Sequence, residues 1–302
     1  MNIKETYELF IRSRSVYCSP ETLHLYEGHL TVFFRYLENI GGKDIGNLAF
    51  DDFGDSQLYG GFIIHLREKG IRNVTIRSYC RIVKAYLRYC YQNGMCPDYL
   101  RGIRLPPDDA HPKIVLYADE VKKIDACFDM LTEKGRRNYC IFHLMLDCGL
   151  RSQEVRHLKY GDIDRDRNII HILNSKGCKS RITLVPDFLV GEIDNYMKLC
   201  GRTSGFLFVS LRSRKPLTGN ALKQVFTKLK KESGIGRLHA HLLRHTFATS
   251  YLIGGGNLEF LRVFMGHSDY NVTKIYSQLA AESKMLGVDV YRLDPVFFRK
   301  GY

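Results

Sequence analysis

Apolar residues between positions 6 and 100 recur every three or four residues, which is the spacing of a helix that buries one face. One helix is predicted to begin at Ser19-Pro20, because serine caps helix starts and proline suits the first turn, and to continue to about residue 37. A second is predicted over about 55–68 and a third over about 73–94. The first third of the chain is therefore predicted to be helical.

The pattern changes in the second part of the chain. Helices are predicted from about residue 118 and over about 137–147, and short apolar runs then predict strands at 168–173, 181–185 and 206–209. The first two strands flank residues 174–180, the predicted tip of a hairpin. The remaining predicted helices cover about 219–233, 241–253, 257–265 and 271–285. The fold class that follows is mainly α with a small antiparallel β-sheet.

Prolines mark a boundary between the two parts. Four of the eight, at positions 97, 106, 107 and 112, lie between two helical regions, which is typical of a linker. We expect a helical domain over 1–105, a linker over 106–113 and a mixed α/β domain over 114–302. Residues 286–302 form an apolar tail, which is expected to dock either on its own domain or on a neighbouring copy.

The charge distribution points to a polyanionic partner. The net charge is +13 and the isoelectric point is about 9.3. Residues 67–104 hold 9 Lys/Arg against 2 Asp/Glu, a net charge of +7, whereas residues 1–66 are net acidic. Within 73–94, Arg77, Arg81, Lys84 and Arg88 fall on one helical stripe. A solvated helix face is the simpler alternative, but four cations without an interleaved acid repel one another, so contact with phosphates is the favoured interpretation.

The composition indicates neither a membrane protein nor a secreted, disulfide-linked one. No run of about 18 apolar residues occurs, so no membrane span is expected, and the first residues lack the apolar stretch of a signal peptide. The nine cysteines are odd in number and lack C-x-x-C spacing. They indicate reduced thiols in a cytoplasmic protein rather than a disulfide framework.

The second domain carries residues suited to attack on a phosphodiester. Two guanidiniums on the non-bridging oxygens would neutralise the charge that repels a nucleophile, and Arg151 and Arg244 fit this role. Tyr276 is the candidate nucleophile, with Tyr270 as a local competitor. A phenol has a pKa of about 10 and needs help from neighbouring cations or a base at neutral pH.

Further residues complete the candidate site. Lys176, at the hairpin tip, could protonate the departing sugar oxygen, although a hairpin lysine is more often solvated. Lys179 and Arg181 are expected to contact backbone phosphates. His241 lies three residues before Arg244, on the same helix face. His239 and His245 raise the alternative of a metal site, which we discount because it lacks an acidic ligand and surrounding cations would repel a metal ion.

Four motifs, taken in order, carry a resemblance to a known family. They are Gly149-Leu-Arg151-Ser-Gln-Glu154-Val155, Ser175-Lys-Gly-Cys-Lys-Ser-Arg181, His241-Leu-Leu-Arg244-His-Thr-Phe-Ala-Thr249 and Met265-Gly-His267, followed by Ile275-Tyr276. In this order and at these intervals the chain resembles the tyrosine recombinase (phage integrase) family over nearly its whole length, in a compact, Xer-like, two-domain form.

The resemblance implies a helical core-binding domain and a catalytic domain that together clamp duplex DNA. It implies that Tyr276 forms a covalent 3′-phosphotyrosyl intermediate. Arg151 and Arg244 would bind the scissile phosphate, and Lys176 would act as the general acid. His241 and His267 would support proton transfer and hydrogen bonding, and Glu154 would orient Arg151. Because the bond energy is kept in the phosphotyrosine, no cofactor or metal ion is required.

The function expected is site-specific recombination by a tetramer on double-stranded DNA. Chromosome-dimer resolution and integration or excision of a mobile element are both compatible with the sequence. Two alternatives remain: a DNA-binding protein of the same fold that no longer cuts, and a type IB topoisomerase that relaxes DNA without exchanging strands. The target sequence does not follow from these residues, because base readout depends on groove geometry.

Overall fold

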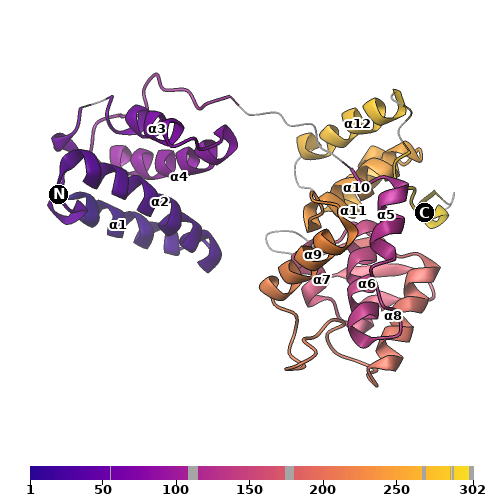
Figure 1. Ribbon diagram of the computed structural model, residues 1–302. Coiled ribbons are helices and arrows are strands. Elements are labelled where there is room, and N and C mark those ends of the chain that lie inside the picture. Colours follow the sequence, from indigo (N-terminus) through magenta and orange to yellow (C-terminus); the bar gives the residue numbers. More distant parts are fainter. Residues whose placement is uncertain are drawn as a thin grey trace. The chain divides into compact units, whose positions relative to one another are not determined.

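A computed structural model describes residues 1–54, 56–107, 115–173, 180–266, 270–285, 287 and 289–298 (Figure 1). The chain divides into two compact units, Met1–His111 and Pro112–Tyr302. As predicted, the fold is mainly helical with a small antiparallel sheet. Within the described ranges, no helix combines the length and the apolar character needed to cross a bilayer.

In its described residues, the first unit is built from four helices around one core. They are α1 (Ile3–Ser15), α2 (Pro20–Gly41), α3 (Tyr59–Glu68) and α4 (Asn73–Gln92), with short 3₁₀ turns at Ile45–Asn47 and Phe50–Asp52. Ser19 caps α2 by accepting a hydrogen bond from the Thr22 backbone N–H, as the sequence predicted. Aromatic rings fill the core, and Phe10 and Tyr86 meet edge to face with their centroids 5.5 Å apart.

In the second unit, other helices pack against one largely buried helix. Its helices are α5 (Ala118–Asp125), α6 (Glu133–Leu146), α7 (Ser152–His157), α8 (Asp187–Leu199), α9 (Gly219–Ser233), α10 (Ala240–Ile253), α11 (Leu258–Met265) and α12 (Tyr270–Met285), with 3₁₀ turns at Tyr160–Asp162 and Pro295–Phe298. Helix α6 is buried along most of its length and packs against α8 and α10. Buried apolar area of this kind is the main stabilising contribution to the unit.

The sheet has three antiparallel strands in the order β1 (Ile163–Asp164), β2 (Ile169–Ile172) and β3 (Arg181–Leu184). Ile170 of β2 lies opposite Ile163 of β1 and Thr183 of β3. The predicted strands at 168–173 and 181–185 are therefore confirmed as an antiparallel pair. Their connection, residues 174–179, lies outside the described residues.

The predicted strand at 206–209 is wrong. Leu207 and Phe208 are buried in the core, which explains the apolar run, but residues 206 and 209 form isolated bridges to Lys159 and Pro216. Core packing, rather than strand pairing, accounts for this segment. Conversely, α8 was not predicted, although Leu189, Ile193, Tyr196 and Met197 have helical spacing and are all buried.

The described part of the tail docks on its own unit. Ala118 donates its backbone N–H to the Asp289 carbonyl, and Tyr291 donates its own to the Leu116 carbonyl. Leu293 and Phe297 are buried, and the ring of Phe297 meets that of Phe247 at 5.4 Å. The contacts described for the tail lie within its own unit, and docking on a neighbouring copy stays a prediction.

A buried polar cluster holds the tail to α6. His143 is 3% exposed at its side chain and hydrogen-bonds through Nδ1 to Asp147 at 2.6 Å and through Nε2 to Asp125 at 2.9 Å. Tyr291 donates its phenolic proton to Asp147 at 2.8 Å. Burial alone would lower the pKa of His143, but the hydrogen bonds and charges of Asp125 and Asp147 raise it to about 9.

This cluster predicts how stability depends on pH. Because the pKa of His143 is raised in the folded state, its stabilising contribution is complete below its unfolded pKa of about 6.5 and is lost as pH rises through about 9. The contribution should be on the order of 3 kcal/mol. Urea unfolding at pH 6 and pH 10 should show a larger loss of stability in the wild type than in His143→Gln. Equal losses would contradict a charged His143.

Candidate active site

Glu154 joins two predicted site arginines. Arg151 precedes α7 and donates its backbone N–H to Glu154 Oε2 at 2.7 Å and its Nη1 to Glu154 Oε1 at 2.9 Å. Arg181, at the start of β3, donates Nη2 to Glu154 Oε2 at 2.7 Å. Burial alone would raise the pKa of Glu154, but Arg181 and Arg151 together hold it below its usual range. The predicted orienting role of Glu154 therefore has a geometric basis.

Arg244 is buried on α10 and held by backbone carbonyls. Its guanidinium donates to the Gly149 and Met265 carbonyls, and Arg151 Nη2 donates to the Gly266 carbonyl at 2.9 Å. Burial, together with nearby Arg151 and Arg181, lowers the pKa of Arg244 to about 9. Three guanidiniums therefore share this region while Glu154 supplies a single negative charge, which favours a bound anion.

Two glycines allow this close approach. Gly149 and Gly266 have φ of +65° and +57°, in the left-handed region that side chains disfavour. A Cβ at Gly149 would lie 2.5 Å from the Phe247 ring, and one at Gly266 would lie 2.6 Å from Arg181 Cδ. The Gly in Gly149-Leu-Arg151 and that in Met265-Gly266 thus shape the arginine cluster directly.

Tyr276 lies beside this cluster. It is on α12, which packs against α10 (Figure 1), and only 2% of the residue is exposed. Burial raises the pKa of the Tyr276 phenol, while Arg244 and Arg151 act in the opposite direction. Because the charges of Arg244 and Arg151 act on this phenol, the candidate nucleophile lies in the neighbourhood of both candidate phosphate ligands.

His245 contacts the Tyr276 phenol and was missed as a site residue. Its Nδ1 lies 2.9 Å from Tyr276 Oη, and its ring centroid is 4.2 Å from that of the exposed His241. Helical spacing was the signal that could have found it, because His241, Arg244 and His245 at i, i+3 and i+4 share one face of α10. From the sequence, His245 was considered only as a metal ligand. Among the described residues, no group of three or more His, Cys, Asp or Glu is placed to hold a metal ion.

Arg181 requires a correction. It was expected to contact DNA phosphates, but its side chain is 4% exposed and its guanidinium bonds to Glu154 and to the Phe264 carbonyl. A side chain so enclosed contributes positive charge to the interior of the site rather than a surface contact. Lys176, Lys179 and His267 lie outside the described residues.

The predicted basic stripe lies on α4 of the first unit. Arg81 and Arg88 are exposed, whereas Arg77 and Lys84 are half-buried. Arg77 donates Nη1 to the Pro106 carbonyl at 2.5 Å. Lys84 and Arg88 line a hollow of about 320 Å³ together with Tyr91 and Gln92. The opposite face of α4 is buried through Ile76, Cys80, Val83, Leu87 and Cys90, so the helix presents its cations outward.

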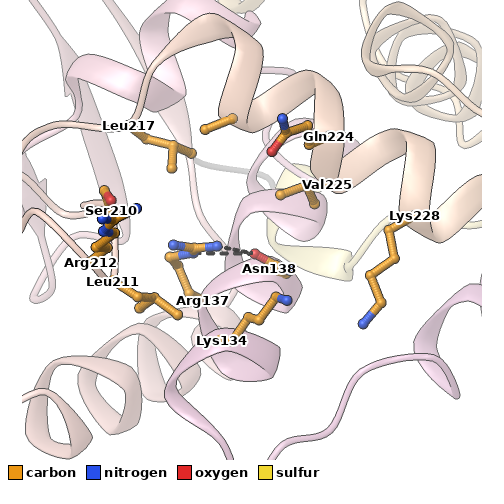
Figure 2. Close-up of a pocket in the computed structure, with 11 residues that line it drawn as sticks. Lys134, Arg137, Asn138, Ser210, Leu211, Arg212, Leu217, Gln224, Val225 and Lys228 are labelled. Carbon is orange, nitrogen blue, oxygen red and sulfur yellow. Dashed lines mark hydrogen bonds between the residues drawn. The ribbon is translucent and has the colours of Figure 1, made fainter.

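A larger hollow of about 470 Å³ lies between α6, α9 and the segment 210–217 (Figure 2). Its walls include Lys134, Arg212 and Lys228. Arg137 also lines it and donates hydrogen bonds to Asn138 Oδ1 at 3.0 Å and to the Val209 carbonyl at 3.0 Å. The dashed lines in Figure 2 mark the bonds to Asn138. Of the predicted catalytic residues that the structure describes, Arg151, His241, Arg244 and Tyr276, none lines this hollow.

Comparison with known families decides the assignment. Residues 115–283 match the Phage integrase family, over more than half of the chain. The chain belongs to this family. It is a tyrosine-type site-specific recombinase, an enzyme that cleaves and rejoins DNA, and the comparisons do not favour a silent binding protein or a topoisomerase.

Relatives of this recombinase align over most of its length. It is 27% identical to the tyrosine recombinase XerC of Bacillus pumilus, with 88% of each chain covered. It is 29% identical to the tyrosine recombinase XerA of Thermococcus onnurineus, with 92% of this chain and 91% of the relative covered. The predicted Xer-like character is therefore confirmed.

Solved structures show the same fold. The Tn1549 transposon integrase, in complex with transposon right end DNA, superposes with a TM-score of 0.73 at 20% identity, covering 95% of this chain and 99% of that chain. The XerH site-specific recombinase, bound to palindromic difH substrate, superposes with a TM-score of 0.69 at 18% identity. The match covers 94% of this chain and 83% of that chain. These similarities confirm the predicted fold class.

Proposed function

We propose that this recombinase cuts duplex DNA by attack of the Tyr276 phenol on a phosphodiester, leaving a 3′-phosphotyrosyl intermediate. One observation carries the proposal: the buried phenol lies beside the cluster of Arg151, Arg181 and Arg244. Their three positive charges exceed the one negative charge of Glu154, which bonds to Arg151 and Arg181. A bound phosphate would supply the missing negative charge and place phosphorus near the nucleophile.

Each residue then has a distinct role. Arg151, with a side chain 34% exposed, and Arg244 bind the non-bridging oxygens and stabilise the charge that develops on them. Glu154 and Arg181 hold Arg151 in place. Lys176 protonates the departing sugar oxygen, and His241 and His267 support the proton transfers, as the family resemblance implies. The intermediate keeps the phosphoester bond energy for rejoining.

The DNA is proposed to lie against both units. Both structural neighbours described above hold recombination-site DNA, which supports duplex DNA as the partner of this chain. In the first unit, which we propose as the core-binding domain, the α4 stripe contacts phosphates. In the second, which we propose as the catalytic domain, Lys179 contacts the backbone. Phosphate contacts of this kind supply affinity and register rather than sequence specificity.

The stripe predicts a defined salt dependence. Replacing the exposed Arg81 and Arg88 by Gln should lower the slope of log affinity against log salt by roughly 0.9 for each phosphate that is no longer neutralised. Lys4 and Arg12, exposed on α1, provide a matched double variant that should leave the slope nearly unchanged. Filter-binding or anisotropy titrations at several salt concentrations would measure it. An unchanged slope in the α4 variant would identify the stripe as a solvated helix face.

Strand exchange between two duplexes requires four active sites, so we propose a tetramer on DNA as the working form, acting in the cytoplasm. The tail, docked within its own unit here, is a candidate for exchange between neighbours in that assembly. Xer-type resolution and integration or excision of a mobile element both remain compatible with this proposal. The genomic neighbourhood and DNA sites recovered by binding selection would distinguish them.

The mechanism predicts recombination in EDTA without nucleotide. The charge on the scissile phosphate is met by guanidiniums and the energy is stored in the phosphotyrosine, so a plasmid with two selected sites should yield recombinants in chelator. Topology of the products would separate recombination from relaxation alone. Loss of cleavage on chelation, restored by magnesium, would contradict the proposed chemistry. Relaxation without exchange would indicate a topoisomerase.

A further inference from the structure

The phenol of Tyr276 has a hydrogen-bond partner outside the six residues predicted for catalysis. His245 Nδ1 lies 2.9 Å from Tyr276 Oη, and the two ring centroids are 5.4 Å apart. The contact joins α10 to α12, so it depends on the packing of these two helices. In the tautomer that carries its proton on Nε2, His245 accepts the phenolic hydrogen bond at Nδ1.

A buried phenol needs such a partner if it is to react. Burial raises the pKa of Tyr276 despite the opposing effect of Arg244 and Arg151, so the phenol is protonated at neutral pH. The proton must leave as the oxygen attacks phosphorus, and a general base has to lie within hydrogen-bond reach to take it. His245 meets this geometric requirement.

Other groups of the described site are less suited to this task. The guanidiniums of Arg151 and Arg244 are donors and cannot accept a proton. Glu154 is engaged by Arg151 and Arg181, which hold its pKa below its usual range. The ring of His241 packs against that of His245 and is exposed, and the phenol contact found here is made by His245.

We propose that His245 is a further catalytic residue, the base that takes the phenolic proton of Tyr276 during strand cleavage. The proposal rests on the role of Tyr276 given above. As Tyr276 Oη forms its bond to phosphorus, its O–H bond breaks and the proton passes to Nδ1. The bond from phosphorus to the 5′ oxygen breaks, and that oxygen takes a proton from the general acid. Rejoining returns the first proton from His245 to the phenol.

Two substrates separate the nucleophile side of this step from the leaving-group side. One is a nicked suicide duplex carrying a selected binding site, and the other is the same duplex with a 5′-bridging phosphorothiolate, whose thiolate departs without protonation. His245→Leu and His245→Asn should slow single-turnover adduct formation by about 10²-fold on both substrates. Lys176→Ala should be slow on the phosphodiester and restored on the phosphorothiolate.

The Asn variant tests proton transfer against positioning. Asn can hydrogen-bond to the phenol but cannot take its proton, so wild-type cleavage by His245→Asn would overturn the proposal in favour of a positioning contact. Wild-type cleavage by His245→Leu would overturn it as well, as would a large loss confined to His241→Asn. His24, 90% exposed at its side chain in the other unit, gives a control variant, His24→Leu, that should cleave normally. Thermal unfolding and DNA affinity show whether each variant is folded.

A pH series adds a readout that misfolding would not imitate. In the His245 variants the phenol must ionise without a base, so their cleavage rate should rise with pH beyond the range in which the wild-type rate levels off. The charged and titratable groups described around this contact are His241 on α10 and, facing Tyr276, Arg244 and Arg151. Parallel profiles for wild type and variants would overturn the proposal. Adduct formation by Tyr276→Phe would instead overturn the proposed nucleophile.

Discussion

Tyr276→Phe is expected to abolish covalent attachment to DNA while leaving binding nearly intact. The substitution removes the attacking oxygen, so adduct formation on a nicked suicide substrate should fall by about 10⁴-fold or more. Stability should change little, because losing the hydrogen bond to His245 costs about 1 kcal/mol. A denaturing gel resolves the adduct, and anisotropy measures binding of the same DNA.

Tyr291→Phe is the matched control for this experiment. Tyr291 is another tyrosine of the same unit, half-buried, and its hydroxyl also donates a hydrogen bond, to Asp147. This variant should still form the adduct, because its oxygen lies in the tail cluster rather than beside Arg244. If Tyr276→Phe forms the adduct at the wild-type rate, Tyr276 is not the nucleophile and Tyr270 becomes the candidate to test.

Glu154→Ala is expected to lower both the free energy of unfolding and the rate of adduct formation. The side chain of Glu154 is 2% exposed and compensates Arg151 and Arg181, which lie near Arg244. Its removal leaves the buried Arg181 guanidinium, and the partly exposed one of Arg151, without their carboxylate; breaking a buried pair typically costs about 3–5 kcal/mol. Chemical denaturation should show this loss. Adduct formation should fall by about 10²-fold even under conditions where the variant is folded, because Arg151 loses its orientation.

Glu192→Ala provides the comparison for a more exposed ion pair. Glu192 pairs with Arg136 at 2.6 Å, but its side chain is 26% exposed, so its loss should cost about 1 kcal/mol or less. Adduct formation should be unaffected, since Glu192 lies on α8 away from the candidate site. Equal unfolding midpoints for the Glu154 and Glu192 variants would contradict the view that Glu154 organises the arginine cluster.

Helical periodicity was sufficient to predict most of the fold. Buried positions on α4 recur at the spacing that the sequence shows, and Ser19 caps α2 as expected. The segment 206–209 could not be read correctly, because an apolar run looks the same whether it pairs in a sheet or fills a core. The distinction depends on contacts with residues 159 and 216, which are remote in sequence.

In the candidate site as well, motifs along the chain were enough to select some residues, whereas contacts between distant segments were not predictable. Residue types and motif order sufficed to select Arg151, Arg244 and Tyr276, which the structure brings together. The burial of Arg181 depends on its pairing with Glu154, 27 residues away. The contact of His245 with Tyr276 spans 31 residues and exists because α12 packs on α10. Such contacts are set by tertiary packing rather than by spacing along one helix.

The carboxylate shared by Arg151 and Arg181 also constrains how this protein diverges from its relatives. A neutral residue at 181 would leave the buried Glu154 without one of its arginine partners, and a neutral residue at 154 would leave both guanidiniums without their carboxylate. Effects of substitutions at contacting sites are not additive, so one change alters the cost of the next. Among homologous sequences, positions 154 and 181 should therefore vary together, and a lineage that loses one partner should soon replace the other.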